Sequence, residues 1–143
     1  MIHTNSNPKN IRYLTELFVK MGFGLDGFKP TSLDFRTNQM VADEASEIVK
    51  LVDYYNEFKG EQVAKVIKKI GALWPSTHQQ VSFEFGREHS PVLYVHFPYW
   101  KSQTERFENR EELVQRSVDL LKICNPDEIG EDYSGFYTRA WWD

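Results

Sequence analysis

The sequence predicts an α+β fold: N-terminal helices packed on a small antiparallel sheet, with a C-terminal helix and a final strand. Apolar residues recur at helical spacing in the first half of the 143-residue chain and again between residues 113 and 124. Between residues 81 and 97 apolar and polar residues alternate instead, which is typical of half-buried strands. No repeat or low-complexity linker divides the chain. We therefore expect a single α+β domain over residues 1–143.

Three helices are expected before the sheet. The Asn7-Pro8 pair is a typical helix start, because Asn can cap free backbone amides and Pro has a preset φ, and helical spacing continues to Met21. A long amphipathic helix is expected over about 38–60, and a third follows directly and ends near Gly71. In the segment 33–35, between the first two helices, the pattern permits a short strand or an extended loop.

A β-hairpin is expected over residues 81–97. Odd-numbered residues are apolar on both predicted strands, so they would form one buried face. The numbers of paired residues must then have an even sum, which favours an odd-length loop such as Glu88-His89-Ser90. This register places Glu84 on the same face as Tyr94 and His96.

The last part of the chain predicts a helix and a strand. Asn109 followed by Glu112 resembles a capping box, and it opens a helix whose apolar stripe ends at Cys124. Alternation over 133–142 indicates a final strand beside the hairpin. The two adjacent tryptophans that end this strand must point to opposite faces of the sheet.

The composition narrows the functional classes. The chain has 17 Lys and Arg against 21 Asp and Glu, a formal net charge of -4, whereas a general nucleic-acid surface needs basic residues in excess. No apolar stretch approaches the about 20 residues of a membrane span, and the first residues lack a signal-peptide pattern, so we expect a cytoplasmic protein without a membrane partner. The single cysteine excludes an internal disulfide. We predict no cofactor and no metal site.

Glu84 and His96 are candidates for catalysis, although their spacing does not specify a reaction. Glu84 and His96 could act as base and orienting partner, or as part of a metal site, but they also fit a polar pair on a solvated face. Cys124 lies on an apolar helix stripe, so we interpret it as a small buried residue; its position at a helix C-terminus would raise a thiol pKa. The lysines between residues 59 and 69 are interpreted as a solvated helix face.

The C-terminal segment is both acidic and aromatic. Residues 105–143 contain ten acidic side chains against five basic ones, a net charge of -5. Such a segment combines long-range attraction for a basic protein with the large, rigid side chains that dominate interfaces. The same aromatics also fit the core of a terminal strand with the acids solvated. Under the first interpretation the candidate binding residues are Asp127, Glu131, Asp132, Tyr133, Tyr137 and Trp142.

The order of elements in the second half is similar to that of a known class of proteins. An aromatic-rich hairpin, a polar helix beginning Asn109-Arg110-Glu111-Glu112-Leu113-Val114, the stretch Asn125-Pro126-Asp127 and an acidic aromatic ending follow one another. This layout, over about residues 80–143, resembles immunity proteins of bacterial polymorphic toxin systems. The resemblance implies a small cytoplasmic protein that binds one cognate toxin, commonly a nuclease. It carries over no site residue.

These observations lead to three hypotheses. The first is a non-enzymatic binding protein, an immunity-type inhibitor that occludes the basic active site of a nuclease-like toxin. The second is a small hydrolase or transferase that uses Glu84 and His96. The third is a phage-encoded inhibitor of host defence, which depends on the same physics as the first. The first and third require a basic protein partner and no nucleic acid.

Overall fold

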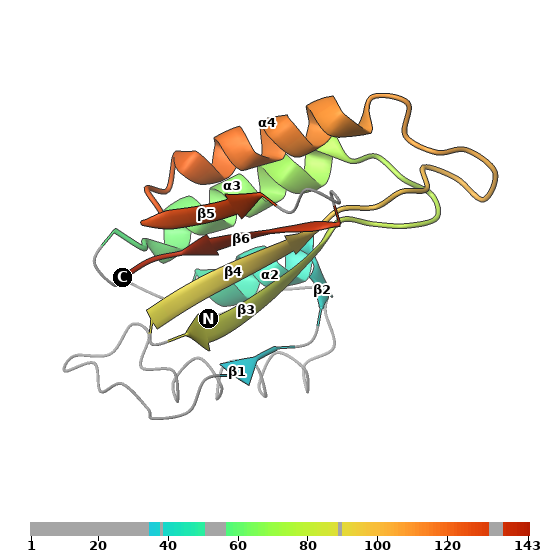
Figure 1. Ribbon diagram of the computed structural model, residues 1–143. Coiled ribbons are helices and arrows are strands. Elements are labelled where there is room, and N and C mark those ends of the chain that lie inside the picture. Colours follow the sequence, from blue (N-terminus) through green and yellow to red (C-terminus); the bar gives the residue numbers. More distant parts are fainter. Residues whose placement is uncertain (1–34, 38, 51–56, 89, 132–135) are drawn as a thin grey trace.

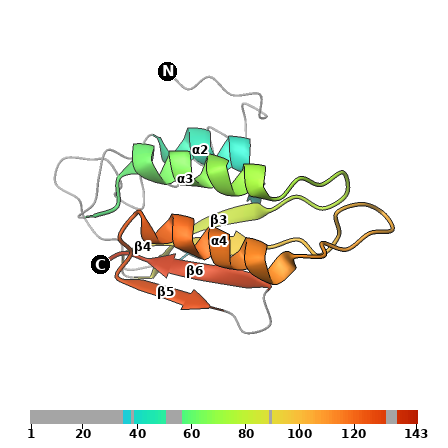
Figure 2. The same cartoon turned by 90° about the horizontal axis from the view of Figure 1, so that it is seen from above.

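The structure, a computed structural model, describes residues 35–37, 39–50, 57–88, 90–131 and 136–143. In this part of the chain six strands form one antiparallel sheet and three helices pack beside it (Figures 1 and 2). The predicted α+β class is confirmed. The helix expected from Pro8 to Met21 lies outside the described residues, and one domain for the whole chain stays a prediction.

The sheet has the strand order β1-β3-β4-β6-β5, and β2 also pairs with β3 on the side away from β4. All described strand pairs are antiparallel, and β5 lies at one edge (Figure 1). The strands are β1 (Phe35–Arg36), β2 (Met40–Val41), β3 (Ser82–Glu88), β4 (Ser90–His96), β5 (Glu128–Glu131) and β6 (Tyr137–Trp141). Phe35 therefore lies in a short strand, which is one of the two predicted alternatives for its segment.

The β3–β4 hairpin has the predicted register. Glu84 pairs with Tyr94, so paired numbers have an even sum, and His96 lies on the same face. The odd-numbered apolar residues of both strands are buried on the other face. The loop is shorter than the predicted three residues, because Glu88 and Ser90 already pair at the end of the ladder.

The prediction of one buried sheet face is wrong. Val92 and Tyr94 are 1% and 5% exposed, and Glu84 is 8% exposed, although all three lie on the even-numbered face. The alternation along β4 is incomplete, since an aliphatic and an aromatic residue occupy positions where a solvated face carries polar side chains. Glu84 is therefore shielded from water on a sheet that buries side chains on both faces.

Three helices accompany the odd-numbered face of the hairpin: α2 (Ala42–Val49), α3 (Gly60–Leu73) and α4 (Arg110–Lys122). α2 begins later than predicted, because the two residues before Ala42 pair with β3 instead. The predicted extension of this helix toward Gly60 is also wrong for 57–59, which are not helical, while 51–56 lie outside the described residues. None of the described helices is long and apolar enough to cross a membrane.

The predicted capping box at the start of α4 is wrong. Asn109 is the N-cap residue, but its side chain makes no capping hydrogen bond. Its backbone, at φ -106° and ψ 39°, departs from the extended conformation in which an N-cap side chain reaches the free amides. Glu111 and Glu112 in the first turn still favour the positive end of the helix dipole.

A continuous hydrophobic core fills the space between the helices and the sheet. Its largest fully buried side chains include Trp142, Phe58 and Phe83, and burial of one such side chain contributes about 1.5–3 kcal/mol. α2 and α3 approach each other closely where Gly71 faces Ala42. A Cβ atom at Gly71 would lie 2.6 Å from the Ala42 Cβ, so glycine permits this contact.

The final strand is confirmed as β6, which pairs with β4 beside the hairpin. β5, which pairs with β6, was not predicted. Asn125 has a left-handed φ of 53° and turns the chain from α4 toward β5. The sequence pattern does not predict β5, because Ile129 is the one large apolar residue of this strand. A single apolar residue cannot show the alternation that is typical of a strand.

Candidate functional site

The candidate binding residues lie at two ends of the sheet. Tyr137 is the first residue of β6, and Trp142 directly follows the end of that strand. Glu131 ends β5 and lies beside the start of β6. Asp132 and Tyr133 lie outside the described residues. The described members are therefore divided between opposite ends of β6.

Trp142 is a core residue, which corrects its assignment as a binding residue. Its side chain is 0% exposed and meets Phe58 edge-on, with ring centroids 4.8 Å apart. Its indole N–H donates a hydrogen bond of 2.9 Å to the Cys124 carbonyl. Trp141 lies on the opposite face, as expected for adjacent residues of a strand. A ring sealed by packing cannot anchor a partner.

Asp127 is exposed at this same end of β6. Its carboxylate accepts a 2.7 Å hydrogen bond from the Asp143 backbone N–H, and its own N–H donates to the Trp141 carbonyl. The neighbouring Glu128 forms an ion pair of 3.2 Å with Arg139. The acidic side chains here are thus separate from the exposed aromatic rings.

Exposed aromatic side chains gather at the other end, where β6 begins. Phe136 and Tyr137 are 55% and 42% exposed. The Phe136 ring meets Tyr99 edge-on with centroids 5.2 Å apart, and the Tyr137 ring lies 5.8 Å from the His96 ring. The Phe97 backbone N–H also donates to the Phe136 carbonyl. Large aromatic side chains in such positions are typical anchors of protein interfaces.

Arg110, the first residue of α4, holds Tyr99 in place. Its guanidinium carbon lies 3.9 Å from the Tyr99 ring centroid, a cation–π contact. Its Nε and Nη2 donate to the carbonyls of Pro98 at 2.9 Å and Phe97 at 3.3 Å. Partial burial lowers the pKa of the guanidinium from its usual value, and Tyr99 acts in the opposite direction. The group remains charged at neutral pH, since arginine titrates far above it.

The loop that carries Tyr99 is also anchored by its neighbours. The Gln79 side-chain oxygen accepts hydrogen bonds from the backbone N–H groups of Tyr99 at 3.1 Å and Trp100 at 2.9 Å. The Phe107 N–H donates to the Tyr99 carbonyl. Below the loop, Trp74 meets Phe107 edge-on at 5.3 Å in the buried core. Tyr99, and the exposed Phe136 ring that meets it, therefore rest on a fixed base.

Carboxylates lie at this same end of the molecule, because α4 and β6 both begin there (Figure 1). Four glutamates that precede or form the first turn of α4 are exposed. The positive charge of Arg106 lies over the Trp100 ring, 5.1 Å from its centroid. We call the two exposed rings, the half-buried Tyr99 ring beside Phe136 and these carboxylates the docking surface: Tyr99, Phe136, Tyr137, Glu105, Glu108, Glu111 and Glu112.

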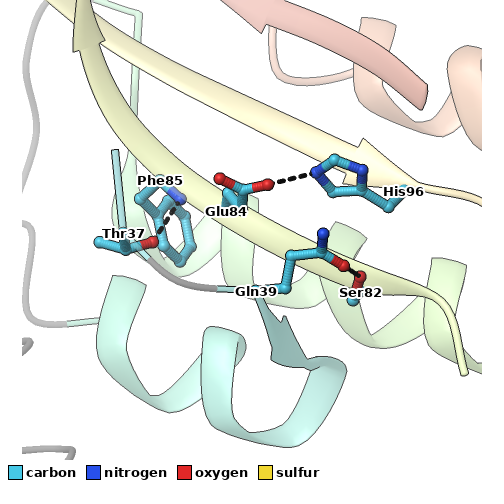
Figure 3. A network of polar contacts seen from close by, with 6 residues as sticks. All are labelled: Thr37, Gln39, Ser82, Glu84, Phe85 and His96. Atoms are coloured by element: carbon cyan, nitrogen blue, oxygen red, sulfur yellow. Dashed lines mark hydrogen bonds and ion pairs between the residues drawn. The ribbon is translucent and has the colours of Figure 1, made fainter. Parts of the chain in front are cut away.

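Glu84 and His96 contact each other, as the predicted register requires (Figure 3). Glu84 Oε1 lies 2.5 Å from His96 Nε2, and the two side chains are 11% and 24% exposed. Beside them the Ser82 hydroxyl donates to the Gln39 side-chain oxygen at 2.6 Å. A shielded carboxylate in this position can orient an imidazole ring and fix its tautomer.

Two hollows formed by described residues lie away from this pair. A hollow of about 500 Å³ lies between the start of α2, the end of α3 and the start of β3, with Asp43 and Lys68 in its wall. A smaller one of about 260 Å³ lies between Leu73 of α3 and Leu120 of α4. The enzyme hypothesis predicts a concave pocket over the even-numbered sheet face, and neither hollow provides it.

Comparison of the chain with protein-family models, curated proteins and solved structures found no match. Among the described residues, no group of three or more His, Cys, Asp or Glu side chains is placed to hold a metal ion. Cys124 is fully buried, and this burial raises the pKa of its thiol to about 11, which favours the interpretation as a structural residue. The docking surface and the Glu84–His96 pair are therefore the two candidate functional features of the described residues.

Tyr99 and Arg110 were not predicted from the sequence. One signal was present: Pro98-Tyr99-Trp100 places two large aromatic residues directly after a strand, in a segment otherwise composed of polar residues. Aromatic residues in a predicted surface loop are stronger candidates for binding than aromatics in a predicted strand, where the core is the alternative. Arg110 gave no comparable signal.

Proposed function

We propose that this chain is a non-enzymatic binding protein, an immunity-type inhibitor that uses the docking surface to occlude a basic toxin. The observation that carries the proposal is the exposure of Phe136, whose ring meets Tyr99 on a base fixed by Arg110. Rings already ordered in the free protein lose little conformational entropy on binding. The surrounding carboxylates attract a basic cleft and occupy positions that substrate phosphates would take in a nuclease.

Affinity capture from the native host with mass spectrometry supplies the partner, and association kinetics then test the carboxylates. The double variant Glu108→Lys/Glu111→Lys should slow association about tenfold at low ionic strength and weaken its salt dependence. The matched control is Glu57→Lys/Glu61→Lys, which reverses two exposed charges near the start of α3, at the far end of the molecule. An unchanged association rate, or equal slowing by both double variants, would contradict the proposal.

The aromatic rings are tested by dissociation kinetics with the same partner. Phe136→Ala should accelerate dissociation about tenfold or more, because truncating an interface anchor acts mainly on the dissociation rate. Ile123→Ala is the matched control, since Ile123 is 52% exposed at the opposite end of α4 and Phe136 is 55% exposed. Similar dissociation rates for the two variants would place the binding site elsewhere.

The close contact between Glu84 and His96 favours a second candidate, a small hydrolase or transferase. That function requires His96→Ala to abolish turnover without loss of folding, whereas the inhibitor function has no turnover to lose. A phage-encoded inhibitor of host defence would use the docking surface in the same way. Genomic neighbours separate these two inhibitors, because a toxin gene directly upstream supports immunity and a prophage context supports the phage protein.

A further inference from the structure

β5 is the terminal strand of the sheet. It pairs with β6 on one side, and in the view of Figure 2 no described segment lies beyond it. One row of its backbone N–H and C=O groups therefore points outward from the sheet. Such an edge is a template to which an extended segment of another protein can add as a further strand.

The edge is held in place from the inside of the sheet. Ile129 packs against the hydrophobic core, and the Thr138 hydroxyl donates a hydrogen bond to the Gly130 carbonyl. Asp127, directly before the strand, donates its N–H to the Trp141 carbonyl at 2.8 Å. Because these contacts already order β5 in the free protein, a segment that pairs with it does not have to order it.

The side chains along the edge favour a basic occupant. Asp127 is exposed and the Glu128 side chain is 64% exposed. Gly130 is exposed without being crowded, since a Cβ there would come no closer than 4.0 Å to the Arg139 carbonyl. The strand thus combines acidic side chains with a bare stretch of backbone, where another chain can approach closely.

We propose that an extended, Lys- or Arg-rich segment of the partner adds to the free edge of β5 as a seventh strand. This inference rests on the proposed function and names the way the partner binds. β5 and the docking surface are continuous through β6, because Glu131 pairs with Thr138, the residue that follows Tyr137. A partner seated on the exposed rings can therefore extend a strand along β5 in the same complex.

The test uses the full chain, labelled with ¹⁵N, and the acetylated and amidated peptide (Lys-Val)₄ as the probe. At a peptide concentration about ten times the dissociation constant, the exposed amides of 128–131 should exchange about tenfold more slowly. A peptide N-methylated at alternate residues cannot form the strand ladder, and (Glu-Val)₄ has the wrong charge, so neither should protect them. Equal protection by either control, or protection at β1 instead of β5, would overturn the proposal.

Variants separate this inference from the proposed function. Glu128→Lys should weaken peptide binding about threefold to tenfold, whereas the control Glu61→Lys should not change it. Phe136→Ala should leave peptide binding to β5 intact. If the peptide fails to protect β5 while the partner still depends on Phe136 and the carboxylates of the docking surface, the strand addition is wrong and the inhibitor function stands.

Discussion

The two ends of the sheet each bury one tryptophan, one beside α4 and the other beside the residues that follow α4, and they differ in the exposure of the neighbouring aromatic rings. At one end Trp142 donates its indole N–H to the Cys124 carbonyl; at the other Trp74 donates to the Ser117 hydroxyl, and both distances are 2.9 Å. We call the end that contains Trp142 the closed end, because this ring is 0% exposed. We call the end that contains Trp74 the open end, because Phe136 and Tyr137 are exposed there. A buried ring stabilises the fold, whereas an exposed ring that rests on an ordered base is available for binding. Both ends of the sheet are rich in aromatic residues, so amino-acid composition does not distinguish them.

Truncation of the closed end should have the largest effect on stability. Trp142→Ala should lower the free energy of unfolding by about 3–5 kcal/mol, because it removes a fully buried ring and its indole hydrogen bond. Phe136→Ala should lower it by less than about 1 kcal/mol, since most of that ring is already in water. Urea unfolding measures both values. Similar losses for the two variants would remove the distinction between the ends.

The hydrogen bond below the open end should have an intermediate effect. Ser117→Ala should cost about 1–3 kcal/mol in the free energy of unfolding, because it leaves the buried Trp74 N–H without an acceptor. Ser46→Ala is the matched control. Ser46 is also fully buried and its hydroxyl donates to a helix carbonyl, that of Asp43, but it accepts no indole hydrogen bond.

We expect the free energy of unfolding, again measured by urea titration, to be highest for the wild type, lower for Ser46→Ala and lowest for Ser117→Ala. Equal losses for the two serine variants would mean that the Trp74 hydrogen bond contributes nothing measurable. No side-chain substitution can make the corresponding change at Trp142, whose acceptor is a backbone carbonyl. The open end is therefore the one whose support can be removed selectively.

The same comparison explains which features could be predicted from the sequence. The β3–β4 register follows from local alternation, so the contact between Glu84 and His96 could be predicted. Alternation also places Trp141 and Trp142 on opposite faces. Which of the two is buried depends on how β6 joins β4, a pairing across about 50 residues that no local pattern specifies.

The docking surface was harder to predict for the same reason. Tyr99, Arg110 and Phe136 come from a loop, a helix start and the approach to a strand, and only the packing of α4 on the sheet brings them together. Overall acidity and aromatic content predicted a binding region in the C-terminal segment. They could not distinguish the closed end from the open one, and Trp142 was therefore assigned to the wrong role.

The smallest effect is expected for the ion pair on β5. Glu128→Gln should change the free energy of unfolding by less than about 0.5 kcal/mol, because Glu128 and Arg139 are 64% and 28% exposed and their attraction is screened by water and salt. Urea unfolding at low salt and at high salt measures the change. A loss above about 1 kcal/mol would show that the carboxylate is structural. A small loss would mean that the closed end depends on Trp142, and not on this ion pair, for its stability. Glu128 could then bind a basic residue of an added strand with little loss in the free energy of unfolding.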